Sequence, residues 1–248
     1  MEKADQPDPG RREFVGKAAA AAALLALAPG VRLVDLVFAR SEEEPVIDAV
    51  RWGMMIDSSK CAQGCDACVR ACDEEFGLES TGRPEIDTHY IRKLALRDEQ
   101  TGKTYSLPML CQHCEHPPCV DVCPTGASFR RADGIVLVDK HICIGCRYCM
   151  MACPYKARSF IHEELSGQRP YAPRGKGTVE SCTFCVHRVD RGETPACVEA
   201  CAATGNRAMI FGDLQDPNSE VAKRARAVPS TEVRADLGLN TGVRYEGI

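Results

Sequence analysis

The stretch CIGCRYCMMACP, residues 143–154, decides the fold of this chain. It places four cysteines in the pattern C-x2-C-x2-C-x3-C and follows the last of them with Pro154. Three thiolates two residues apart let the backbone wrap one corner of a cubane. The fourth, Cys153, follows at a helical interval and points away from that corner. The stretch therefore predicts ligands for a cubane iron–sulfur cluster, with a last cysteine that serves a different cluster.

The remaining cysteines repeat this arrangement in three further groups with altered spacing. Group one reads C-x3-C-x2-C-x3-C, group two reads C-x2-C-x4-C-x3-C and ends in Pro124, and group four contains a longer excursion. In chain order, the four groups are Cys61, Cys65, Cys68 and Cys72; Cys111, Cys114, Cys119 and Cys123; Cys143, Cys146, Cys149 and Cys153; and Cys182, Cys185, Cys197 and Cys201. All 16 cysteines are used, which predicts four [4Fe–4S] clusters with these cysteines as iron ligands.

Three other uses of so many cysteines fit less well. Structural zinc takes pairs of C-x2-C knuckles, whereas here three close cysteines precede a distant fourth. Disulfides staple small exported domains, but this chain is long enough not to need so many. Covalent haem requires C-x-x-C-H, and Cys114 and Cys185 are followed by Glu115 and Val186.

The N-terminal residues have the pattern of an export signal. A twin arginine, Arg11-Arg12, precedes Phe14 and the apolar run 18–28. As a helix, that run would span about 16 Å, about half of a bilayer core, so it favours a signal over a membrane span. An ordinary amphipathic helix is the alternative, but the all-round apolar composition argues against it. We expect residues 1–39 to be a twin-arginine signal peptide, with an imperfect cleavage site at residues 37–39.

The type of signal carries chemical information. This segment resembles the twin-arginine signals that export proteins already folded around a cofactor. We therefore expect cluster insertion in the cytoplasm, followed by a periplasmic location.

Composition sets further limits. The chain has 248 residues, with 31 Lys and Arg against 35 Asp and Glu, so a nucleic-acid partner is not expected. Only 6% of the residues are aromatic. A core this poor in aromatic side chains suggests a fold organised around what the cysteines hold.

Short predicted elements surround the cysteine groups and give an α+β fold class. Strands are expected at residues 51–57, 104–110, 135–138 and 208–211, and helices at residues 68–76, 149–156 and 219–227. Asp133-Gly134 favours a hairpin turn. The Gly-, Pro- and base-rich residues 163–178 indicate an exposed loop. Residues 213–248 contain no cysteine and are expected to be a C-terminal tail on the surface or on a partner.

Several motifs carry a family resemblance. They are CQHCEHPPC at residues 111–119, CPTGA at 123–127, FGDL at 211–214 and DPNS at 216–219. With four cysteine groups in this order, about residues 50–220 resemble the iron–sulfur subunits of the dimethyl sulfoxide reductase superfamily of respiratory complexes. The signal, the absence of a C-terminal anchor and the group-one spacing look most like the periplasmic iron–sulfur subunit of the Dsr membrane complex. Subunits of nitrite, polysulfide and tetrathionate respiration are the alternatives.

The resemblance implies how the groups pair. The four implied ligand sets are Cys61, Cys65, Cys68 and Cys201; Cys182, Cys185, Cys197 and Cys72; Cys111, Cys114, Cys119 and Cys153; and Cys143, Cys146, Cys149 and Cys123. Two bacterial-ferredoxin-like modules would then hold two clusters each. A discontinuous module, residues 40–95 and 179–212, would enclose an inserted one, residues 96–178.

The sequence indicates electron transfer rather than catalysis at a substrate site of its own. It contains no Gly-rich phosphate loop and no spare cysteine, and its six histidines form no paired metal motif. His113, His116 and His141 lie beside cysteine groups and are expected to donate hydrogen bonds there. The resemblance implies an integral membrane, quinone-reactive subunit of the NrfD type as one partner, and a multihaem cytochrome or molybdopterin subunit as the other. The alternative is a structural or redox-sensing cluster protein.

Overall fold

Short helices and strands alternate through residues 45–248, the part of the chain that this computed structural model describes. The predicted signal segment, residues 1–39, lies outside the described residues. The strands are β1 (Trp52–Asp57), β2 (Ile91–Arg97), β3 (Thr104–Leu110), β4 (Ser128–Arg130), β5 (Val136–Val138), β6 (Ser159–Phe160), β7 (Val179–Glu180), β8 (Met209–Asp213) and β9 (Val243–Glu246). The helices are α2 (Ala67–Phe76), α3 (Pro118–Asp121), α4 (Tyr148–Ala152), α5 (Val186–Val189), α6 (Ala196–Ala203), α7 (Glu220–Ala227) and the 3₁₀ turn Ala235–Leu237. This mixture of helices and strands is the one that the sequence predicts.

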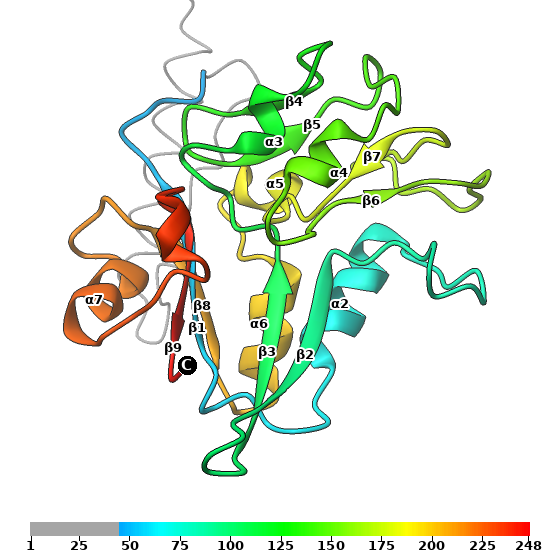
Figure 1. Ribbon diagram of the computed structural model, residues 1–248. Coiled ribbons are helices and arrows are strands. Elements are labelled where there is room, and N and C mark those ends of the chain that lie inside the picture. Colours follow the sequence, from blue (N-terminus) through cyan, green and yellow to red (C-terminus); the bar gives the residue numbers. More distant parts are fainter. Residues whose placement is uncertain (1–44) are drawn as a thin grey trace, which may run out of the picture. The chain divides into compact units, whose positions relative to one another are not determined.

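A three-stranded sheet joins distant parts of the chain. Its order is β8-β1-β9, with β1 antiparallel to β8 and parallel to β9. β1 is buried from Gly53 to Asp57, as expected for a central strand that carries apolar side chains on both faces. Because β1 precedes group one and β8 follows group four, their pairing brings the helices of these two groups, α2 and α6, side by side (Figure 1).

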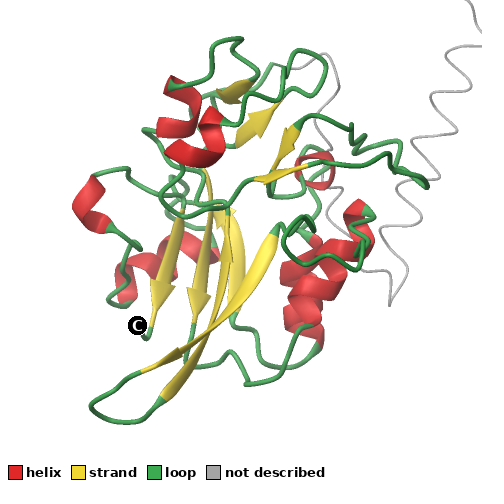
Figure 2. Ribbon diagram, turned by 45° about the vertical axis from the view of Figure 1, so that its right-hand side comes forward, coloured by secondary structure: helices red, strands yellow, loops and turns green. Residues whose placement is uncertain are grey.

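Two helices that carry cysteines pack on each other beside this sheet. α2 bears Cys68 and Cys72, and α6 bears Cys197 and Cys201. The β2–β3 hairpin lies next to the same sheet, where the Tyr245 hydroxyl of β9 donates to the Pro108 carbonyl of β3 (Figures 1 and 2). The long strands and the two longer cysteine-bearing helices therefore form one part of the core.

The segment from group two to the start of group four folds as short antiparallel pairs. β4 pairs with β5 across the turn that contains Asp133-Gly134, and β6 pairs with β7. α3 packs on α4, and these helices carry Cys119 and Cys149. The hairpin prediction is confirmed. The helix expected at residues 149–156 is shorter, because Cys153 adopts an extended backbone ahead of Pro154.

The prediction of a surface tail at residues 213–248 is wrong. The helix expected at 219–227 is present as α7, with the Ser219 hydroxyl accepting from the Ala222 amide at its N-terminus. Beyond it, β9 completes the sheet, and Val243 and Tyr245 are fully buried. The segment is therefore part of the core rather than an appendage.

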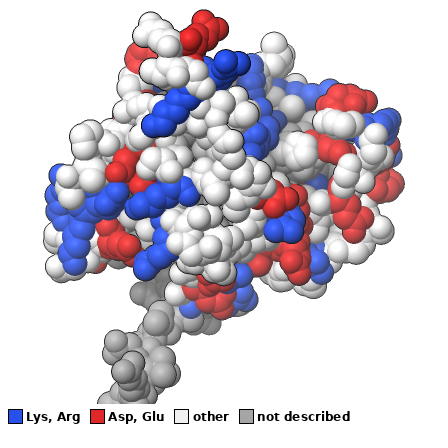
Figure 3. Space-filling model, turned by 90° about the horizontal axis from the view of Figure 1, so that it is seen from below, with Lys and Arg blue, Asp and Glu red and all other residues white. Residues whose placement is uncertain are grey.

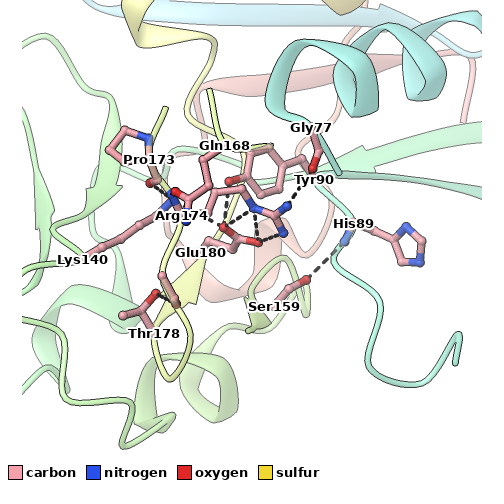
Figure 4. Close-up of polar contacts among 11 residues, drawn as sticks. Gly77, His89, Tyr90, Lys140, Ser159, Gln168, Pro173, Arg174, Thr178 and Glu180 are labelled. Carbon is pink, nitrogen blue, oxygen red and sulfur yellow. Dashed lines mark hydrogen bonds and ion pairs between the residues drawn. The ribbon is translucent and has the colours of Figure 1, made fainter. Parts of the chain in front are cut away.

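The loop at residues 163–178 is largely exposed, as expected, but it carries two buried residues, Arg174 and Thr178. Figure 4 shows that its Arg174 guanidinium makes a paired contact with the buried Glu180 carboxylate, at 2.6 Å for Nη2, and donates to the Gly77 carbonyl. Tyr90 donates its hydroxyl to the same carboxylate. Burial alone would raise the pKa of Glu180, but the bonds from Arg174 hold it below its usual range. The buried ion pair thus fastens the loop to β7, and the bond to Gly77 fastens it to the end of α2.

Charges of both signs cover the surface. In the view from below, Lys and Arg gather toward the side of α7, and Asp and Glu gather toward the opposite side (Figure 3). α7 carries Lys223, Arg224 and Arg226, and Arg224 forms a paired contact with Glu246. The mixed surface agrees with the nearly balanced charge of the sequence.

Candidate iron–sulfur cluster sites

Two small, partly open cavities between groups two and three are each lined by four cysteines. The first is lined by Cys111, Cys114 and Cys119 of group two and by Cys153 of group three. The second has three cysteines of group three and one of group two. Its cysteines are Cys143, Cys146 and Cys149 of group three and Cys123 of group two. The structure thus exchanges the last cysteine between the two groups.

Groups one and four exchange cysteines in the same way. Burial raises the pKa of the Cys68 thiol to about 11, and the neighbouring thiols include Cys61, Cys65 and Cys201 of group four. Cys201 also accepts a hydrogen bond from the Ala208 amide at 3.2 Å, which helps to fix its position.

The reciprocal exchange places Cys72 among the cysteines of group four. Burial raises the pKa of this thiol, and the charges of Cys182, Cys197 and Cys185 raise it further. The thiols of groups one and four therefore lie close together, because α2 and α6 pack on each other.

The electrostatics of these sites favour ligation by a cationic core. Burial raises the pKa of Cys111 to about 12 and that of Cys185 to about 11. Clustered thiols of this kind lose their protons when a metal centre compensates the charge of the thiolates. Cys123 differs, since hydrogen bonds from the Ser128 and Thr125 region outweigh its slight burial and lower its pKa. The donor set fits iron–sulfur clusters.

The arrangement of the cysteines favours iron–sulfur clusters over single metal ions as the bound group. All 16 cysteines are unpaired. Within residues 45–248, no three His, Cys, Asp or Glu side chains are placed to hold one metal ion. Instead, the cysteines surround cavities, and a cubane that offers a separate iron to each thiolate suits such a spread.

Buried polar atoms near the cysteines further test whether these sites suit bound clusters. Several that have no partner among the described residues lie beside the cysteines: Gln112 Oε1, His113 Nε2, Ser128 Oγ, Tyr155 OH, Arg158 Nη1 and Thr183 Oγ1. Cluster sulfides accept hydrogen bonds, so hydroxyl, imidazole and guanidinium donors in these places fit bound clusters. Unpaired buried donors are otherwise costly.

His113 is the histidine that best matches the expected role. Its Nδ1 accepts from the Val136 amide at 3.0 Å, which leaves the proton on Nε2. Burial lowers the pKa of His113 to about 3, so it remains a neutral donor. Its ring stacks on Phe184, between Cys182 and Cys185, with centroids 3.6 Å apart. By contrast, His116 and His141 are exposed.

Gly145 shows why a glycine stands inside group three. Its φ is +69°, and an added Cβ would lie 2.2 Å from the Gly177 carbonyl oxygen. Both features exclude a side chain.

Three further residues beside the cysteine sites, Arg158, Tyr155 and Thr183, were not among the predicted site residues. Each carries one of the buried polar atoms without a partner among the described residues. Their closeness to a cysteine in the sequence is the only local signal that could have found them.

Comparisons with known proteins give consistent results. The family described as 4Fe-4S dicluster domain matches residues 103–214, which contain groups two to four. The chain is 43% identical to the Hdr-like menaquinol oxidoreductase iron-sulfur subunit 1 of Archaeoglobus fulgidus, over 95% of this chain and 97% of that protein. It is 37% identical to a tetrathionate reductase subunit of Salmonella typhimurium, over 87% and 78%. It is 42% identical to protein NrfC of Escherichia coli K12, over 77% and 78%.

Proposed function

Because the chain belongs to the family of iron–sulfur electron-transfer subunits of reductase complexes, we propose that it conducts electrons through four [4Fe–4S] clusters held by its sixteen cysteines. The observation that carries the proposal is the pair of cavities, each lined by three cysteines of one group and one of another. The proximity of Cys201 to Cys68, and of Cys72 to group four, supports two further sites of the same kind.

The proposed architecture is two ferredoxin-like modules. Groups one and four would form the discontinuous module, residues 40–95 and 179–212, completed by the C-terminal strand β9. Groups two and three would form the inserted module, residues 96–178. The pairing of β1 with β8 supports the discontinuous module, and the packing of α3 on α4 supports the inserted one.

The chain's own residues would position and tune the clusters. Bound cubanes supply one-electron oxidation and reduction. Cysteine side chains hold the irons, and the buried donors beside them, such as His113 Nε2, stabilise the negative charge that reduction adds. Most of the cysteines are buried, which keeps water from the sulfurs.

The two modules also approach each other through their ligands. The charge of Cys111 in the inserted module acts on Cys182 in the discontinuous one. This proximity supports electron transfer between the modules.

We further propose that the protein works in the periplasm between two redox partners. One would be an integral membrane quinone-reactive subunit of the NrfD type, and the other a multihaem cytochrome or a molybdopterin subunit. The resemblance to a menaquinol oxidoreductase subunit supports a quinol-linked role, and the family resemblance favours a Dsr-type complex of sulfur-compound metabolism. Nitrite and tetrathionate systems are the alternatives that other relatives support.

Attachment to the membrane is proposed to occur through the partner subunit. No helix within residues 45–248 is long and apolar enough to cross a bilayer.

A redox titration of the purified full chain tests the function. We expect iron and sulfide contents that correspond to four cubanes, several reversible one-electron reductions, and reoxidation by a quinone analogue in the presence of the membrane subunit. Clusters that stay redox-silent, or that break down when cycled, would instead support a structural or sensing role.

Export provides a separate prediction. Changing Arg11 and Arg12 together to Lys should leave folded, brown, cluster-loaded protein in the cytoplasm, because twin-arginine transport reads the arginine pair rather than its charge. Cell fractionation and the visible spectrum of each fraction measure this. The matched control is Arg32→Lys, which lies outside the pair and should be exported normally. Normal export of the double variant contradicts the proposed signal.

A further inference from the structure

Arg158 is a buried cation placed against the ligands of the inserted module. It lies between α4 and β6, its side chain lines the cavity of Cys111, Cys114, Cys119 and Cys153, and only 5% of its surface is exposed. Its Nη2 donates to the Cys119 sulfur at 3.1 Å. Its Nη1 is buried and has no partner among the described residues.

The guanidinium stands between two ligand sets rather than inside one. Burial acts to lower the pKa of Arg158, but the charges of Cys119, Cys111 and Cys149 raise it above its usual value. Cys119 and Cys111 line one cavity, and Cys149 lines the other. A guanidinium remains charged at any working pH, so this is a fixed positive charge next to both sites.

The discontinuous module has a different electrostatic environment. Asp73 acts on Cys72, and Glu75 and Glu199 act on Cys185, in each case with a negative charge. Two positive charges act there as well, the half-buried Lys93 on Cys68 and Arg188 on Cys185. Arg188 is itself paired with Glu75 and Glu199, which offset its charge. Water screens a partly exposed ammonium more than a buried guanidinium.

We propose that Arg158 sets the reduction potentials of both clusters in the inserted module and raises them relative to those of the discontinuous module. The proposal rests on the proposed function, since it requires the two clusters to be present. Each cluster takes up one electron and no proton, and the added negative charge is stabilised by the fixed cation and its hydrogen bonds in a low-dielectric site. Electrons would therefore collect in the inserted module.

Arg158→Gln in the cluster-loaded full chain tests the inference. Potentiometric titration followed by electron paramagnetic resonance should show two of the four midpoint potentials lowered and the other two unchanged. We expect at least a tenfold decrease in each equilibrium constant for reduction, which is about 59 mV for a one-electron couple. If Arg158 had only a structural role, its replacement would leave the midpoint potentials of the remaining clusters unchanged.

Arg147→Gln is the matched control. Arg147 follows Cys146, carries the same charge and lines the second cavity, but its side chain is exposed and stacks on Phe160. Water screens its charge, so removing it should shift the potentials much less. Equal shifts in the two variants, or four unchanged midpoints in Arg158→Gln, would overturn the inference. Wild-type protein without four reducible clusters would instead refute the proposed function.

Arg158→Lys covers the case in which the neutral variant loses iron. A single ammonium keeps the charge but cannot reproduce the planar group whose Nη2 donates to the Cys119 sulfur. We therefore expect at least one of the two midpoints to fall. Wild-type potentials at both clusters would then contradict the role of the guanidinium.

Discussion

Cys201→Ser is expected to damage the cluster bound by Cys61, Cys65 and Cys68, although these residues lie at the opposite end of the described chain. The packing of α6 on α2 places Cys201 beside Cys68, so the serine would remove one of four ligands from that site. Spectroscopy should show this cluster lost or converted to a three-iron form. The two clusters of the inserted module should be intact, because none of their ligands changes.

The reciprocal variant supplies a matched control. Cys72→Ser removes a cysteine from group one, yet it should damage the cluster of Cys182, Cys185 and Cys197, because Cys72 lies among those thiols. The two variants should thus affect different clusters, each in the group that was not mutated. Damage confined to the mutated group in either variant would refute the exchange of ligands.

Ending the chain after Asn240 is expected to prevent stable folding. The deletion removes β9, whose backbone pairs with β1, and exposes the core positions occupied by Val243 and Tyr245. Losing a buried aromatic side chain alone costs about 3–5 kcal/mol. A typical domain is stable by only about 5–15 kcal/mol, so the loss of the whole strand is severe. Soluble yield, iron content and the thermal unfolding midpoint measure the effect.

Two milder changes control for the truncation. Deleting Ile248 alone removes a half-exposed terminal residue and should change little. Tyr245→Phe keeps the ring but leaves the buried Pro108 carbonyl and the Gln112 amide without the hydroxyl that they contact. We expect this variant to lose about 1–3 kcal/mol of unfolding free energy. A truncated chain that folds with a full complement of iron would restore the view of this segment as a surface tail.

Much of the local structure could be predicted because its causes are local. Runs of β-branched and apolar residues before, between and after the cysteine groups predicted β1, β3, β5 and β8. α7 was predicted from its polar start at Ser219 and its helix-forming composition. The cysteine spacing indicated the cofactor class, because three close thiolates constrain the backbone around one corner of a cubane.

By itself, then, the sequence determined the cysteine groups, the cluster chemistry and most of the helices and strands near them. Tertiary structure decided that β9 is a core strand, since parallel pairing of Val243–Glu246 with β1 joins residues far apart and leaves no local pattern beyond four alternating residues. It also decided that Arg158 lies between two cysteine sites. A lone arginine after a cysteine motif is usually solvated, and only the tertiary structure buries this one beside the cysteines of groups two and three.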